Sequence, residues 1–262
     1  MTPEQKRAAG EAHAHADELM ARVEEEQPGV WDRLDGLRAN PPAQWPDWCL
    51  LPMAAPATIA ANRPGGLLGG PAPATMAALY AWRFARSVWL FEPSLLTRLL
   101  RQVPDAVTVD DFAGLPEWCV YITEASPEFP GVGVWAHLEA DANTGRPELR
   151  LLLDNGDVDQ PQMSIPVYLD RGSTTEALGD YRATTLASMG GQRGTNVRGG
   201  QLDAAAAALA EQVDGYLGVL AYLARPQADI QHATRYGLRP VRPRRPKKPT
   251  ARDVWLVGYA DT

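Results

Sequence analysis

The chain has 262 residues, 45% of them hydrophobic, and a net charge of −7 at pH 7. No apolar run approaches the roughly 18 residues that a membrane-spanning helix needs, and the polar opening stretch lacks the apolar core of a secretory signal. Two cysteines 70 positions apart do not form a disulfide framework, which favours a reducing compartment. We therefore expect a cytoplasmic protein that has no membrane partner.

The N-terminal segment predicts two helices. Thr2, Pro3 and Gln5 form the start of a capping box, which predicts a helix over about 3–25. Its apolar stripe is thin, so we expect the helix to be exposed or loosely docked; the stripe consists of Ala12, Ala16, Leu19 and Val23. A short helix is expected near 29–39, where apolar residues recur at helical spacing.

A Gly- and Pro-rich break at 63–73 precedes the most apolar helix that the sequence predicts, over 74–91. This segment is apolar on most sides, which indicates that it is buried. Arg83 and Arg86 within it then need either carboxylate partners or the surface. A further short helix should follow at 94–103.

The middle of the chain predicts β-structure. Four segments alternate apolar and polar residues with a period of two: 117–123, 132–139, 148–154 and 163–170. One apolar face per strand, with turn-rich breaks between the strands, predicts hairpins of an antiparallel sheet that is covered on one side. Pro166 inside the fourth segment indicates an edge position or a bulge. A last strand at 254–259 should return to this sheet.

The longest regular helical pattern runs over about 202–224. Its apolar positions alternate in steps of four and three, at Leu202, Ala206, Leu209, Val213, Tyr216, Leu220 and Leu223. Such a stripe packs either across the sheet or against a partner helix, and a core position is the commoner case in a domain of this size. Gly215 and Gly218 permit close backbone approach there. Before it, we expect a short helix over 175–189 and a glycine-rich loop over 190–200.

Together these elements predict an α+β fold. We expect a helical N-terminal part and a central antiparallel sheet of about four to five strands, packed against a long C-terminal helix. The chain divides into a polar helix, a helical part, the sheet with the long helix, a basic arm and a final strand; these are residues 1–28, 29–114, 115–234, 235–252 and 253–262.

The segment 235–252, which we call the basic arm, is the strongest physical feature of the sequence. It contains no acidic residue and eight basic ones: Arg235, Arg239, Arg242, Arg244, Arg245, Lys247, Lys248 and Arg252. The rest of the chain carries 17 basic against 32 acidic residues, a charge of −15. Frequent prolines predict an extended, mobile arm. Its cations are candidates for contacts with nucleic-acid phosphates, and the alternatives are a solvated linker or docking onto an acidic protein surface.

Both cysteines lie in similar stretches, WPDWCLLP at 45–52 and LPEWCVYI at 115–122. Two thiols without a further local pair do not match a zinc site. Cys119 could act as a nucleophile only with a basic neighbour, and His137 would reach it if their strands pair. Buried packing anchored by Trp48 and Trp118 is the simpler interpretation, and the absence of other similarity argues against an internal repeat.

The remaining polar groups form no recognisable catalytic pattern. His13 and His15 are two positions apart on a helix and point in different directions, so metal binding by this pair is not expected. The stretch DNGDVD at 154–159 lacks the spacing of a calcium loop and predicts a hairpin turn. Nucleotide-binding and hydrolase motifs are missing from the sequence. We expect neither catalysis, nor a metal, nor a cofactor.

The order of several motifs resembles one known family. The stretches WPDWCLLPMAA, YAWRFARSVWLFEPSLLTRLL, LPEWCVYI, ELRLLLD, LGVLAYLARPQADI and VWLVGY, which span most of 29–260, are similar to the anti-CRISPR family that suppresses production of the type V CRISPR effector nuclease. The similarity lies in the order and spacing of these stretches and includes no catalytic signature. The N-terminal helix and the rich basic arm are departures that put the specificity for a target in question.

The resemblance implies a function that the residues alone do not. Members of this family are carried by phages and other mobile elements. They act during translation, in connection with recognition of the N-terminal part of the nascent effector and loss of its messenger RNA. The implied role is a non-enzymatic regulatory binding protein whose partners are a nascent or folded target protein and the ribosome or messenger RNA. The alternatives are a general RNA- or DNA-binding accessory protein acting through the arm, and a hydrolase or redox enzyme using Cys119 and His137.

Overall fold

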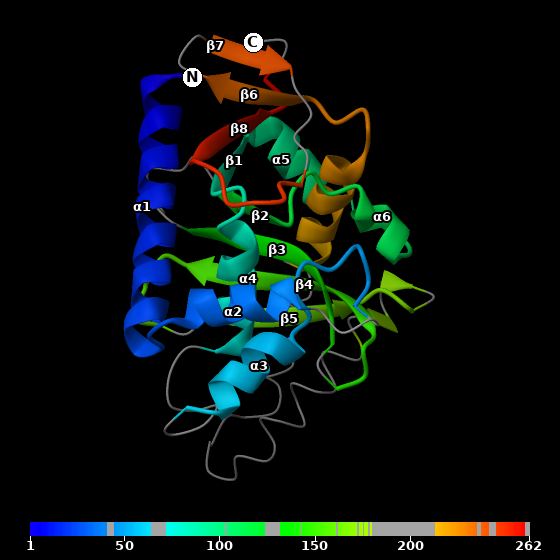
Figure 1. The fold of residues 1–262 in the computed structure, drawn as a ribbon. Coiled ribbons are helices and arrows are strands. Elements are labelled where there is room, and N and C mark those ends of the chain that lie inside the picture. The colour runs from blue at the N-terminus through cyan, green and yellow to red at the C-terminus, as the bar shows by residue number, and fades with distance from the viewer. Residues whose placement is uncertain are drawn as a thin grey trace, which may run out of the picture.

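The fold was analysed in a computed structural model (Figure 1). It describes residues 1–40, 45–63, 72–102, 104–123, 132–141, 143–160, 162–171, 173–174, 176–177, 179, 213–234, 237–240 and 245–259. The expected helix at 175–189 lies almost wholly outside these residues, and the expected loop at 190–200 lies wholly outside them. Among the described residues, no helix is long and apolar enough to cross a membrane.

The described helices follow the predicted order, with two additional short ones. They are α1 (Pro3–Glu26), α2 (Val30–Ala39), α3 (Ala54–Ala61), α4 (Pro73–Trp82), α5 (Pro93–Leu99) and α6 (Val109–Ala113), and residues 213–224 are also helical. The predicted capping box of α1 is confirmed, because the Thr2 hydroxyl accepts from the Gln5 amide while the Gln5 side chain accepts from the Thr2 amide. The helices α3 and α6 were not predicted from the sequence.

In the part of the chain that the structure describes, eight strands form one sheet. They are β1 (Ser87–Phe91), β2 (Cys119–Thr123), β3 (Val132–Ala140), β4 (Pro147–Asn155), β5 (Met163–Tyr168), β6 (Ile230–Thr234), β7 (Gly237–Pro240) and β8 (Asp253–Val257). Their order in space is β5-β4-β3-β2-β1-β8-β6-β7. The four predicted central strands are confirmed as β2 to β5, and the predicted last strand returns to the sheet as β8. Pro166 lies in β5, which is an edge strand as predicted.

The prediction of an antiparallel sheet of four to five strands was wrong in detail. The sheet is mixed, because β1 pairs in parallel with β2 on one side and with β8 on the other. The stretch 87–91 is therefore a strand, although the sequence predicted it as the end of a helix over 74–91. Its residues, SVWLF, are β-branched and aromatic, and their two strand partners lie far away along the chain. For these residues, pairing with two distant strands outweighed the helical periodicity of the local sequence.

The turn between α4 and β1 is made at Arg86, whose φ of 48° lies in the left-handed region. The Arg86 amide donates to the Trp82 carbonyl at 2.7 Å, which closes the end of the helix. The carbonyl of Arg86 accepts from the Asp253 amide at 3.2 Å and faces the His13 Nε2 atom at 2.9 Å. These contacts hold a non-glycine residue in a strained conformation and direct the chain into β1.

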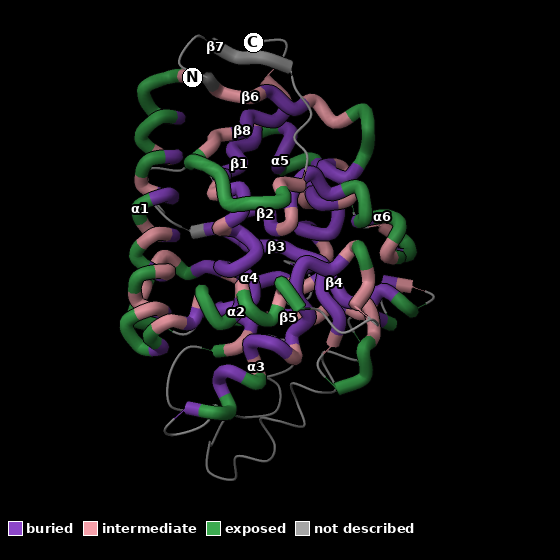
Figure 2. The backbone as a smooth tube through the Cα atoms, viewed as in Figure 1, coloured by how far each residue is buried: buried purple, intermediate pink, exposed green. Residues whose placement is uncertain are grey.

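Both faces of the sheet are covered, so the prediction of cover on one side only was wrong. One face packs against α1, α2, α3 and α4, and the other packs against α5, α6 and the helix at 213–224. Figure 2 shows the resulting buried centre, with exposed residues along the outer sides of the helices. The helix α1 is firmly docked, since Ala12, Ala16, Leu19 and Val23 of its predicted stripe are all buried. We had expected it to be exposed or loosely attached.

The helix at 213–224 is a core element, as its stripe predicted. Val213, Leu217, Leu220 and Leu223 are fully buried against the sheet. A Cβ atom added at Gly218 would lie 2.3 Å from the Gln102 carbonyl oxygen, so this position needs glycine for close packing. Residues 202–212 of the predicted helix lie outside the described part.

Candidate functional site

The basic arm is described over its last eight residues and in the backbone of β7. Arg235, Arg242 and Arg244 lie outside the described residues, and Arg239 is described in its strand backbone only. Arg245, Lys247, Lys248 and Arg252 are described with their side chains. These four residues do not share one environment, because Arg245 is half-buried, Arg252 is ion-paired, and the two lysines are exposed.

Arg245 joins the two similar tryptophan–cysteine stretches. Its guanidinium carbon lies 4.9 Å from the centre of the Trp118 ring, and its Nη1 atom donates to the Trp48 carbonyl at 3.5 Å. The Trp118 indole in turn donates to the Pro246 carbonyl at 2.8 Å. The repeated tryptophans therefore hold the arm, in addition to packing against the core as predicted.

Arg252 is fixed at the other end of this segment by Asp17 of α1. One oxygen of Asp17 accepts from the Arg252 guanidinium and the other accepts from Arg86. Nearby, the Thr250 amide donates to the Phe84 carbonyl at 3.0 Å. The described segment 245–252 is thus attached at both ends, so the predicted mobile arm is wrong for these residues. The physical reason is that the body supplies an indole ring and a carboxylate at the right places.

The two lysines lie between these attachments. Lys247 and Lys248 are exposed, and the backbone carbonyl of Lys247 accepts from the Arg38 guanidinium at 3.5 Å. In the part of the chain that the structure describes, neither ammonium group has an ion-pair partner. The structure therefore places Arg245, Lys247 and Lys248 on one segment that is attached to the body at both ends. Arg252, in contrast, forms an ion pair with Asp17.

The Cys119–His137 pair does not have the properties of a catalytic dyad. The two residues are directly opposed between β2 and β3, as the hypothesis required, but both are buried. Burial raises the pKa of the Cys119 thiol well above its usual range and lowers the pKa of His137 to about 3. The imidazole Nε2 atom lies 3.1 Å from the Glu139 carboxylate. A protonated thiol without access to substrate is a packing group.

A buried ionic cluster that was not predicted from the sequence lies beside this pair. Arg150 of β4 forms ion pairs with both Glu139 and Glu148, and its Nη1 atom donates to the Ser164 hydroxyl at 3.0 Å. Burial raises the pKa of Glu148. The only sequence signal was the pair of charged residues Glu148 and Arg150, two positions apart in β4 and therefore on the face opposite Leu149 and Leu151. Cross-strand register then places Glu139 opposite Glu148.

The two histidines of α1 serve separate contacts, as their spacing predicted. His13 contacts the Arg86 carbonyl, whereas His15 Nε2 lies 2.9 Å from Asp154, which also accepts from the Tyr121 hydroxyl at 2.6 Å. Among the described residues, no group of three His, Cys, Asp or Glu side chains has the geometry to hold a metal ion.

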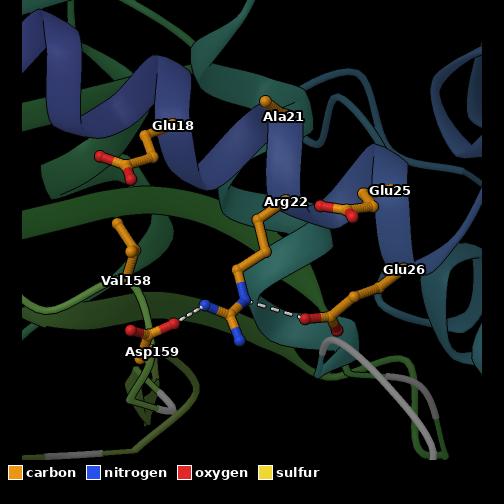
Figure 3. Close-up of a pocket in the computed structure, with 7 residues that line it drawn as sticks. All are labelled: Glu18, Ala21, Arg22, Glu25, Glu26, Val158 and Asp159. Carbon is orange, nitrogen blue, oxygen red and sulfur yellow. Dashed lines mark hydrogen bonds and ion pairs between the residues drawn. The ribbon is translucent and has the colours of Figure 1, made fainter.

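An open groove of about 610 Å³ lies between α1 and the turn that follows β4 (Figure 3). Its walls carry four carboxylates, those of Glu18, Glu25, Glu26 and Asp159. Arg22 lies between two of them, with an ion pair to Asp159 and a 2.9 Å contact from Nε to Glu26. The turn itself, DNGDVD, is a hairpin turn held by Asn155 and Asp157 side chains, as predicted.

Comparison with known proteins places this fold and sequence in one family. The family model described as AcrVA2-like, anti-CRISPR type V subtype A2, matches residues 89–260. The crystal structure of AcrVA2 has a TM-score of 0.61 to this chain at 16% identity, and the match covers 94% of this chain and 84% of that one. At this identity the structural likeness shows the fold alone. No curated protein sequence matches.

The matched residues begin within β1 and extend past β8, so they include part of β1 and all of the other strands described in the sheet. They also include the helices α5 and α6, the helix at 213–224 and the whole basic arm. This stretch is more than half of the chain, and the chain therefore belongs to the AcrVA2-like family of type V anti-CRISPR proteins.

Proposed function

We propose that this protein lowers the production of a type V CRISPR effector nuclease by recognising the effector while it is being translated. The observation that carries this proposal is membership in the anti-CRISPR type V subtype A2 family over residues 89–260. Action during translation is inferred from the family that the sequence motifs resemble. The partners in this proposal are the nascent or folded effector and the ribosome or transcript that accompanies it.

The buried thiols support a binding role over a catalytic one. Burial raises the pKa of Cys49 to about 12 and that of Cys119 well above its usual range, so neither sulfur is a thiolate at neutral pH. In the cluster with Arg150, the carboxylates of Glu139 and Glu148 are likewise fully buried. A non-enzymatic protein acts through its surface, and the held basic segment is the part of that surface with the most distinct charge.

Co-expression in bacteria tests the proposal. A type V effector gene and this protein are placed on separate plasmids, and effector protein and effector transcript are measured by quantitative immunoblot and reverse-transcription PCR. We expect both to fall when this protein is present. An effector transcript that lacks its start codon serves as the matched control, and its level should not change because no nascent chain is made.

Two outcomes would contradict the proposal. Unchanged effector protein and transcript would exclude suppression of synthesis. Equal loss of the translated and the untranslated transcript would exclude recognition during translation and would indicate direct action on RNA. Addition of the purified protein to a preassembled effector should leave DNA cleavage unchanged, since the proposed step precedes assembly.

A further inference from the structure

The described cations of the basic arm differ in how their charge is balanced. Arg252 shares the single negative charge of Asp17 with Arg86, so its charge is partly offset within the fold. Arg245 has no carboxylate within ion-pair distance among the described residues, and the same holds for Lys247 and Lys248. Three unbalanced positive charges therefore lie within four consecutive residues of a chain whose net charge is −7.

Arg245 carries the strongest sign of a missing anion. Its Nε atom is buried and has no hydrogen-bond partner among the described residues. Its other contacts are a 3.5 Å hydrogen bond to the Trp48 carbonyl and the face of the Trp118 ring. Burial lowers the pKa of this guanidinium, and no carboxylate offsets that effect. An anion bound beside it would remove this electrostatic cost.

The segment is also held in place before any ligand arrives. The Trp118 indole fixes the Pro246 carbonyl at 2.8 Å, and the Arg38 guanidinium contacts the Lys247 carbonyl at 3.5 Å. Beyond the lysines, the Thr250 amide and hydroxyl both donate to the Phe84 carbonyl at 3.0 Å. A held segment loses less conformational entropy on binding than a free tail of the same composition.

We propose that Arg245, Lys247 and Lys248 form a binding site for the phosphodiester backbone of single-stranded RNA. This proposal deepens the proposed function and rests on it for the source of the ligand, since a transcript accompanies the nascent chain. Two exposed lysines and a half-buried arginine on one irregular segment fit an extended polyanion, whereas a DNA duplex is read by a helix or β-ribbon inserted in its groove. Trp48 and Trp118 are only partly buried beside the site, and aromatic side chains are the usual neighbours of such contacts.

The site has a measurable salt dependence. Three phosphate contacts on a single strand predict a slope of about −2 for the logarithm of the association constant against the logarithm of salt concentration. We would measure it by fluorescence anisotropy of the full-length protein with a labelled 20-nucleotide RNA of mixed sequence, between about 50 and 200 mM salt. Affinity should fall about 20-fold over this range.

A matched pair of double variants separates the site from the overall charge. K247A/K248A removes two charges from the site, and we expect affinity at 50 mM salt to fall about tenfold and the slope to drop to about −0.7. K6A/R7A removes two exposed, adjacent charges from α1 and should bind RNA like the wild type. Arg245→Lys keeps the charge but loses the planar stack on Trp118, and it should weaken binding at an unchanged slope. Circular dichroism checks that each variant is folded.

Several results would overturn the proposal. Wild-type binding that is absent, or insensitive to salt, would exclude a phosphate site. Equal losses in K247A/K248A and K6A/R7A would assign binding to net charge. Tighter binding of poly-glutamate or of single-stranded DNA of the same sequence would assign the site to another polyanion. If K247A/K248A loses RNA binding but still suppresses effector synthesis in cells, the RNA site and the proposed function both stand, and the link that we propose between them is overturned.

Discussion

At the scale of single residues, the carboxylate of Glu117 shows how one buried group fastens three strands. It lies just before β2 and accepts from the Trp255 indole of β8 at 3.0 Å and from the Trp89 indole of β1 at 3.1 Å. The Ser87 hydroxyl donates to it as well. The two indole rings stack with centres 5.5 Å apart. Burial raises the pKa of Glu117 to about 7, against which these three donors act in the opposite direction.

Because of Glu117, we expect the unfolding free energy of the protein to fall as the pH rises from 4.5 to about 7. The unfolded chain loses the proton of Glu117 near pH 4.5, whereas the folded chain keeps it until about pH 7. The folded state is therefore progressively disfavoured between these two values, by about 3 kcal/mol in total. In Glu117→Gln this titration is absent. The difference in unfolding free energy, variant minus wild type, should therefore increase by about 3 kcal/mol between pH 4.5 and about 7.

Urea unfolding at a series of pH values measures the difference. Glu25→Gln is the matched control, because it makes the same chemical change at an exposed position of α1 and leaves the three donors to Glu117 in place. A Glu117→Gln profile that is parallel to the wild type would show that Glu117 does not titrate in this window.

At the scale of elements, the helix at 213–224 and α5 are packed at backbone contact. Cβ atoms built at Gly218 would lie 2.3 Å from the Gln102 oxygen and 2.6 Å from the Leu99 oxygen, and a Cβ at Gly215 would lie 2.9 Å from the Leu100 oxygen. Backbone atoms cannot move aside as a flexible side chain can. Both glycines lie within the helix that the sequence predicted. The sequence therefore indicated the close approach of another backbone, but not that the end of α5 supplies it.

Two glycine-to-alanine changes in helices should therefore have opposite effects. Gly218→Ala should destabilise the fold by about 1–3 kcal/mol or more, because the added methyl group overpacks the contact with α5. Gly10→Ala should stabilise it by about 0.5–1 kcal/mol, since Gly10 is exposed in α1 and nothing lies within 4 Å of its added Cβ. Chemical denaturation of the three proteins gives both values. A stabilising Gly218→Ala would mean that the two helices are further apart.

At the scale of the whole molecule, the sheet is held together by pairings between distant parts of the chain. The strand β8 lies between β1 and β6, so the last described strand is internal to the sheet. Val88, Trp89 and Leu90 are directly paired with residues 254–256 in parallel register. Such non-local pairing is expected to slow folding, because a long loop must close before any of its contacts are made.

Removal of β8 should consequently prevent folding. A chain that ends at residue 252 would lose the partner of both β1 and β6 and expose two unpaired strand edges. We expect this truncated chain to be insoluble, or to lack a cooperative thermal transition by circular dichroism. Leu256→Ala in the full chain should remain folded and lose about 2–5 kcal/mol of stability, because Leu256 is fully buried. A cooperative transition in the truncated chain would contradict the central role of β8.

The sequence by itself determined the elements whose pattern is complete within a few neighbouring residues. The capping box and apolar stripe of α1, the alternation in β2 to β5, the burial of α4 and the two close-packing glycines were all readable in this way. It also identified the basic arm and the family resemblance. In each case the physical cause, helical or strand periodicity or local charge, lies within one segment.

Only the tertiary structure decided what depends on distant residues. SVWLF becomes β1 because β2 and β8 lie on either side of it, in spite of the helical pattern that precedes it. Arg252 is paired with Asp17, 235 positions away, whereas Arg245 is held by Trp118 without a carboxylate. Charge and spacing in the sequence did not distinguish the eight cations of the arm from one another. Their environments differ because ion pairing and desolvation are set by whichever parts of the chain the fold brings beside them.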